Sequence, residues 1–163
     1  MYTAALEFLE DERDAWRPYE ALAQLTDAEL ELPTPADGPG HGWSGRELIG
    51  HVVGWLEHVL AVARELAVRD HSPAYAAASA DWDARGDLVN EELHAAWAAL
   101  SMDEVRRRLE TVPGELRGTL TVVPEARWLK DPRMSTFFLM DTLEHYEEHL
   151  PELGAVLAQA GRA

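Results

Sequence analysis

Three histidines in two separate segments are the residues of this sequence best suited to chemistry. His51 lies in WSGRELIGHVVGWLEHVL, and His145 and His149 lie near the end, in DTLEHYEEHL. Residues four apart on a helix share a face, so the side chains of His145 and His149 are expected to point the same way. If the two helices pack together, three imidazoles meet at one point and form an open site for a divalent metal ion.

Three neutral histidines leave at least one coordination position of such an ion for another molecule. A bound water could be acidified toward neutrality and used as a nucleophile. Alternatively, the ion could bind and activate the thiolate of an external cosubstrate. The spacing does not choose between zinc, nickel, iron and manganese. The sequence assigns no catalytic side chain beyond these ligands.

Further residues are weaker candidates for the surroundings of this site. Asp141, one turn before His145, could accept a hydrogen bond from the free ring nitrogen of that histidine, although an acid that favours the helix dipole is the commoner role. His58 and Trp55 could form a second layer around the ligands or the wall of a pocket. Large aromatic side chains usually belong to the core, but several more could line this pocket. These are Trp43, Trp82, Trp97 and Trp128.

Each candidate histidine also has an ordinary explanation. The pair His145 and His149 could lie on a solvated face, since glutamates surround it in the sequence. His51 lies at an apolar helix stripe and could be a core histidine bonded to a backbone group or a hydroxyl. The remaining histidines lie in or near loops or on an exposed helix and are given no role: His41, His71 and His94.

Apolar spacing and capping signals predict the helices that must position these residues. Ser44 with Glu47 and Ser101 with Glu104 form capping boxes. Pro113 and Gly114 are expected to interrupt the helix that follows Ser101, and the third helix of the fold is expected to be split in two. The predicted helices cover residues 4–31, 44–68, 87–99, 101–112 and about 135–159. Because no segment alternates with period two for long, we expect residues 1–163 to form one all-α domain, a four-helix up-down bundle.

Composition excludes several kinds of partner and site. Thirty acidic against fourteen basic residues give a formal net charge of −16, so phosphate backbones and anionic lipids are repelled and no nucleic-acid or membrane partner is expected. There is no cysteine, so a metal site must use histidine or carboxylate ligands. The lack of cysteine and of a visible secretory signal is consistent with a cytoplasmic protein.

The motifs together resemble those of the DinB/YfiT-like metalloenzyme superfamily, whose members are four-helix bundles. WSGRELIGHVVGW resembles the second-helix motif of that family, EHYEEHL its last-helix histidine pair, and NEELHAAWAALSMDEVRRRL its third helix. The branches most similar are ClbS/DfsB and the stand-alone relatives of the mycothiol-dependent maleylpyruvate isomerase N-terminal domain. The resemblance implies a metal, zinc or nickel first, held by His51, His145 and His149. It also implies a homodimer, and either thiol-dependent transfer or isomerisation or a detoxifying hydrolysis.

Three hypotheses of function follow. The first is a metal-dependent transferase or hydrolase that uses a small thiol or water to attack a small electrophilic substrate. The second is a non-catalytic protein that binds or sequesters a small molecule in the bundle pocket, for example in self-resistance. The third is a structural or interaction protein whose histidines have no ligand. The first two require the three histidines or the tryptophans to line a cavity, which a structure can test.

Overall fold

The protein is all-helical in the computed structural model, which describes residues 2–80 and 82–162, without the side chains of residues 82–84. No strand is found within these residues. The α-helices are α1 (Ala5–Trp16), α2 (Asp27–Leu30), α3 (Gly45–Val68), α4 (Pro73–Ser79), α5 (Trp82–Ala98), α6 (Met102–Leu120), α7 (Pro132–Leu139), α8 (His145–Glu148) and α9 (Leu150–Gln159). Two 3₁₀ segments cover Arg17–Gln24 and Glu125–Arg127, and a π-helix covers Met140–Glu144.

Helix α3 is the central element of the fold, and its bounds agree with the prediction. Ser44 accepts a hydrogen bond from the backbone N–H of Glu47, and the Glu47 carboxylate accepts from the backbone N–H of Ser44 at 2.8 Å. This predicted capping box is therefore confirmed. Of the box predicted at Ser101, the structure shows one half: Ser101 accepts from the backbone N–H of Glu104, whereas the Glu104 carboxylate accepts from Arg107 and Arg108. Most of α3 is buried, including Leu48, Val52 and Val59. Burial on several faces is consistent with a helix that is covered by neighbours on more than one side.

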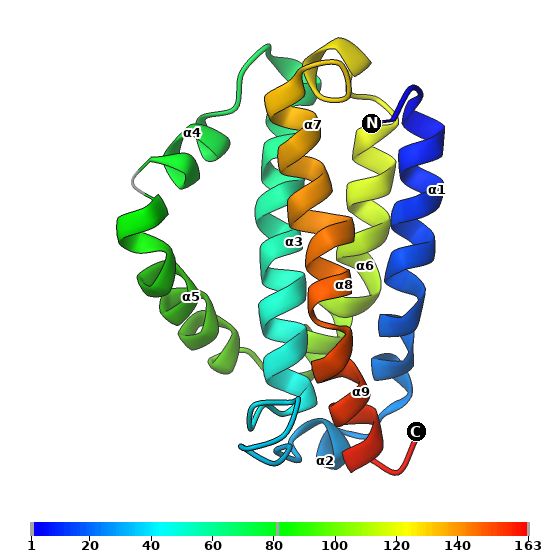
Figure 1. Cartoon of the computed structure of the whole chain (residues 1–163), viewed down its shortest axis with the longest axis vertical. Coiled ribbons are helices and arrows are strands. Elements are labelled where there is room, and N and C mark those ends of the chain that lie inside the picture. Colours follow the sequence, from blue (N-terminus) through cyan, green and yellow to red (C-terminus); the bar gives the residue numbers. More distant parts are fainter. Residues whose placement is uncertain (1, 81, 163) are drawn as a thin grey trace.

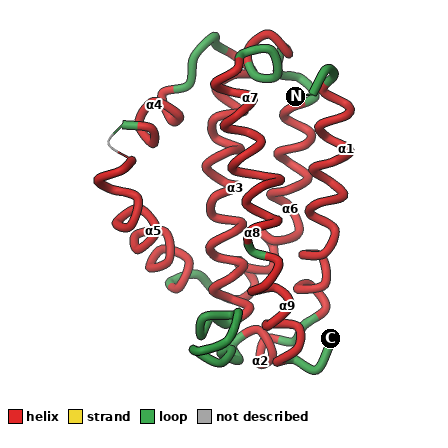
Figure 2. Tube along the Cα trace, viewed as in Figure 1, coloured by secondary structure: helices red, strands yellow, loops and turns green. Residues whose placement is uncertain are grey.

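The long helices lie side by side, with α4 and α5 standing to one side of them (Figure 1). Helices α1, α3 and α6 lie beside the segment that runs from α7 to α9, whereas α4 and α5 form an arm that returns to the lower end of α3 (Figures 1 and 2). The expected split of one third helix in two is wrong, because α5 and α6 are separate helices that run in opposite directions (Figure 1). The chain reverses between them at Ala99–Ser101.

Several helix bounds differ from the predictions because proline and capping residues act locally. The predicted helix over residues 4–31 ends as an α-helix at Trp16, where Pro18 enters a 3₁₀ segment, and a missed capping box of Thr26 and Glu29 starts α2. Conversely, α6 continues through Pro113, which is buried on the same side of the helix as Val112 and Leu116, so tertiary packing outweighs the lost hydrogen bond. Helix α5 begins earlier than predicted, and α4 lies in what was expected to be a connector.

The last helical segment begins earlier than residue 135 and is not uniform. Asp131 caps α7 by accepting from the backbone N–H of Arg133, and Pro132 occupies a first-turn position where its missing N–H costs nothing. The segment ends at Gln159, as predicted, but a π-helix interrupts it, and a second break follows at His149. These irregularities lie next to the candidate metal ligands.

A buried polar network ties the N-terminal helix to the last segment. Glu12 on α1 is fully buried and accepts hydrogen bonds from Arg117 and from the hydroxyl of Tyr146, both at 2.8 Å. Tyr19 donates to the backbone carbonyl of Tyr146 at 2.6 Å. Tyr146 directly follows His145, so the network fixes the rotation of the helix that carries this histidine. Among the described residues, no helix is both long and apolar enough to cross a membrane.

Candidate metal centre

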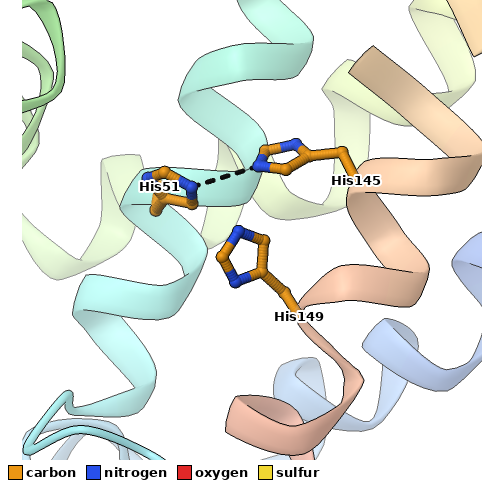
Figure 3. Close-up of side chains that lie close together, drawn as sticks. All are labelled: His51, His145 and His149. Atoms are coloured by element: carbon orange, nitrogen blue, oxygen red, sulfur yellow. Dashed lines mark hydrogen bonds between the residues drawn. The ribbon is translucent and has the colours of Figure 1, made fainter. Parts of the chain in front are cut away.

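The three predicted histidines converge in the structure. His51 comes from the first half of α3, His145 begins α8, and His149 lies between α8 and α9. One ring nitrogen of each lies within 4.8 Å of the others, and the ring centroids are 4.6–5.0 Å apart. Figure 3 shows the three rings pointing toward one another from two neighbouring segments. The prediction that they share one point is therefore confirmed at the level of geometry.

The ring nitrogens of the three histidines are placed as metal ligands would be. The Nε2 atoms of His51 and His145 are 3.1 Å apart, and two nitrogens at 2.0–2.1 Å from a tetrahedral zinc ion would be about 3.4 Å apart. Nδ1 of His149 faces Glu152 on the other side of the ring, which leaves its Nε2 facing the other two histidines. The donor set is three neutral nitrogens, which suits zinc, nickel or iron better than calcium or magnesium.

Burial keeps the imidazoles of His51 and His145 uncharged. Desolvation, and next the positive charge of neighbouring histidines, lowers the pKa of His51 to about 4 and that of His145 to about 3. Both rings therefore remain neutral at physiological pH and keep a lone pair free. In the absence of an ion, one of the two Nε2 atoms donates a hydrogen bond to the other. His51 and His145 therefore need no deprotonation to bind a divalent cation near neutral pH.

Tryptophan side chains enclose the site on two sides. The ring of Trp43 lies 5.2 Å from that of His51 and stacks at 5.9 Å on that of His149. The ring of Trp55 meets His145 edge-on at 6.5 Å and donates a hydrogen bond to Asn90 at 3.1 Å. Aromatic walls lower the local dielectric and strengthen any interaction between a cation and its ligands. Of the other tryptophans expected to line the pocket, Trp97 and Trp128 are buried, and the side chain of Trp82 lies outside the described residues.

The predicted role of Asp141 is wrong. Nδ1 of His145 is buried and has no hydrogen-bond partner among the described residues, so Asp141 does not orient it. The π-helix Met140–Glu144 has more residues per turn than an α-helix, so the straight i, i+4 line expected from the sequence is lost. Asp141 lies in the first turn of this π-helix. It is partly buried, and desolvation raises its pKa to about 6.

Glu152, which was not among the residues predicted from the sequence, is the carboxylate placed beside the free ring nitrogen of a candidate ligand. Its Oε2 lies 3.6 Å from Nδ1 of His149, just beyond hydrogen-bond length, and both atoms are buried without a closer partner in the described part of the chain. Its Oε1 lies 3.7 Å from His41. The i+3 spacing from His149 could have indicated this contact, but Pro151 and the run of glutamates made the segment look solvent-exposed.

His58 and Trp55 line a small cavity beside the metal centre, and the ring of Trp55 also contacts that of His145. This cavity of about 120 Å³ is bounded by Gly54, Trp55, His58, Ala78, Val89 and Leu93. Nε2 of His58 is buried and lacks a partner within the described residues. Both residues line this cavity, and their role around a metal ion stays a prediction.

A larger cavity opens at His51 itself. It has a volume of about 430 Å³ and is lined by Trp43, His51, Asn90, Glu91, Leu93 and His94. His94, which was given no role, lies at its edge and bonds to the Glu47 carboxylate at 3.1 Å. The volume of this cavity lies within the range typical of small-molecule sites. A ligand in this cavity would lie against one of the three candidate metal ligands.

Comparisons with protein-family models, with curated proteins and with solved structures give no match to this chain. The functional argument therefore rests on the geometry of the site and on the motifs of the sequence.

Proposed function

We propose that this protein is a metal-dependent enzyme that holds one divalent ion on His51, His145 and His149. The convergence of three imidazoles, with one ring nitrogen of each within 4.8 Å of the others, carries this proposal. Structural zinc sites normally have four protein ligands, whereas three ligands beside a cavity are typical of a catalytic ion with a free position. The adjoining cavity of about 430 Å³ gives a substrate access to that position.

The reaction proposed is attack on a small electrophilic substrate by a small external thiol or by water, as in a thiol transferase or a detoxifying hydrolase. A bound divalent ion would lower the pKa of either nucleophile and orient it. The chain's own residues would position the reactants. Trp43 limits the access of bulk water from one side, and the network of Glu12 and Tyr146 holds the helix of His145 in place.

The fold proposed is a four-helix up-down bundle of the DinB/YfiT-like superfamily, built from α1, α3, α6 and the segment α7–α9. The motifs quoted from the sequence and the position of the histidines on α3 and the last segment support this assignment. Zinc or nickel is the proposed ion, a homodimer the proposed assembly and the cytoplasm the proposed location. The net charge of −16 supports a small-molecule substrate over a nucleic acid or a membrane surface.

The first experiment is metal analysis of protein purified without a histidine tag. The proposal predicts about one divalent ion per chain and a higher unfolding temperature after zinc or nickel is added to metal-free protein. His145→Ala should abolish both effects, whereas the control His71→Ala, at an exposed histidine outside the site, should keep them. Metal-free protein whose unfolding temperature does not respond to either ion would exclude the proposal.

The alternative function is binding or sequestration of a small molecule without turnover. The observation that favours it is the cavity lined by Trp43 and Leu93, because such a cavity binds a ligand whether or not a metal is present. Ligand binding by metal-free protein and the absence of turnover in the presence of zinc or nickel, with and without added thiol, would favour this alternative.

A further inference from the structure

Three neighbouring hollows lie along α3 and α5 and are together called the α3–α5 groove; the middle hollow adjoins the metal centre at His51. The 430 Å³ cavity at His51 shares His94 with a second cavity of about 330 Å³ near the start of α3, and it shares Leu93 with the 120 Å³ cavity near His58. Three hollows that share their wall residues in this order can hold different parts of one elongated molecule. The middle hollow is the one that contacts a candidate metal ligand, His51.

Two glycines of α3 set the position of α5 along this groove. A Cβ atom on Gly54 would lie 2.6 Å from Leu93, and one on Gly50 would lie 3.0 Å from Trp97. Both glycines therefore allow α5 to approach α3 more closely than any larger residue would. Because Leu93 also lines two of the three hollows, this close packing fixes the wall of the groove.

The walls of the middle hollow favour a ligand that is not an anion. Trp43 and Leu93 supply apolar surface, and Asn90, Glu91 and His94 supply polar groups. None of the described residues that line this hollow is a lysine or an arginine. Asn90 uses its carbonyl oxygen to accept from Trp55, so its amide N–H groups remain to donate to a ligand.

The cation nearest along the groove is already engaged. Arg46 lines the neighbouring hollow, but its Nη1 donates to the Glu31 carboxylate at 2.7 Å. Its Nη2 donates to the backbone carbonyls of Ala98 and Leu100 at 3.0 and 2.5 Å. An anionic ligand in the middle hollow would face the Glu91 carboxylate, whereas the Arg46 guanidinium of the neighbouring hollow already pairs with Glu31 and keeps only its Nε unpartnered among the described residues.

We infer that the α3–α5 groove binds an elongated organic molecule that is neutral or positively charged, with a flat apolar part against Trp43 and a cationic or donor group near Glu91. This inference names the class of substrate for the proposed enzyme, and its binding part does not depend on the metal. The reactive group of such a molecule lies beside His51, and its ends extend into the two neighbouring hollows.

The test uses three probes of one shape and different charge on metal-free protein at low salt. Tryptamine is a cation, tryptophol is neutral and indole-3-acetate is an anion, and ligand-observed NMR or calorimetry gives the affinity of each. We expect tryptamine to bind about fivefold more tightly than tryptophol, and indole-3-acetate to bind more weakly than both. The preference should fall at high salt, because Glu91 is exposed and its charge is screened.

Two adjacent glutamates of α5 provide the matched variants. Glu91→Gln should reduce the affinity for tryptamine to about that for tryptophol, whereas Glu92→Gln, at an exposed residue that does not line the groove, should leave the preference unchanged. Equal effects of the two variants, or binding of indole-3-acetate at least as tight as that of tryptamine, would overturn the inference. The binding test uses metal-free protein and so does not depend on the proposed enzyme. If metal analysis finds that the protein binds no metal but the tryptamine preference is kept, only the proposed enzyme is refuted.

Discussion

Replacement of Asp141 by asparagine should stabilise the protein at neutral pH but not in acid. No hydrogen bond or ion pair is found for Asp141 among the described residues, and desolvation raises its pKa from an ordinary 3.8 to about 6. Because the pKa is higher in the folded chain, the contribution of Asp141 to stability is fully present below pH 3.8 and is lost as the pH rises through about 6. The shift of roughly two pKa units corresponds to at most about 3 kcal/mol, and screening by solvent reduces it to about 1–2 kcal/mol.

The assay for this prediction is urea unfolding of metal-free protein, followed by tryptophan fluorescence, at about pH 4 and about pH 8. Asp141→Asn should match the parent protein at the lower pH and exceed it by about 1–2 kcal/mol at the higher one. Glu148→Gln, on the exposed side of α8, is the control and should change the free energy of unfolding by less than about 0.5 kcal/mol at both pH values. The reasoning is refuted if Asp141→Asn lowers the free energy of unfolding by a similar amount at both pH values. That result would show that the Asp141 side chain has a partner in the folded protein.

The remaining predictions concern residues that hold the site in place. Glu12→Ala should lower the free energy of unfolding by about 3–5 kcal/mol, because the Arg117 guanidinium loses the buried carboxylate that it contacts. Tyr146→Phe should lower it by about 1–3 kcal/mol, because the hydrogen bond to Glu12 is lost; urea unfolding measures both. Glu152→Gln should weaken zinc binding about tenfold, as measured by chelator competition, because the carboxylate behind His149 is lost; unchanged zinc affinity would contradict that role. Gly54→Ala should lower stability by about 1–3 kcal/mol through a clash with α5, whereas Gly118→Ala, in open space on α6, should raise it by about 0.5–1 kcal/mol; the same direction of change for both would contradict the packing argument.

The sequence predicts those parts of the fold whose signals are local. The capping box at Ser44 and the apolar positions after it predict α3, and the spacing of His145 and His149 predicts their shared face. Convergence with His51 requires the two helices to pack together, and the motif order that resembles the DinB/YfiT-like family supplied that expectation. The structure confirms the convergence from α3 and the last segment.

The features that were predicted wrongly depend on contacts distant in the sequence. No sequence signal in residues 132–159 predicts the π-helix that breaks the alignment of Asp141 with His145. Nor does any signal predict that the Glu152 carboxylate lies beside Nδ1 of His149. Likewise, Pro113 predicts a break from its own chemistry, but the packing of its neighbours keeps α6 continuous. The separate course of α5 depends on Gly50 and Gly54, whose role is visible only once their neighbours across the groove are known.

Titration of metal-free, tag-free protein with Co²⁺, followed by visible absorption, tests the central claim most directly, because the ligand field of cobalt reports the number and type of its ligands. The account predicts saturation at about one ion per chain, a spectrum typical of nitrogen ligands in a site of low coordination number, and loss of that spectrum in His51→Ala, His145→Ala and His149→Ala alike. A spectrum indistinguishable from that of aqueous Co²⁺, or one that survives all three substitutions, would contradict it.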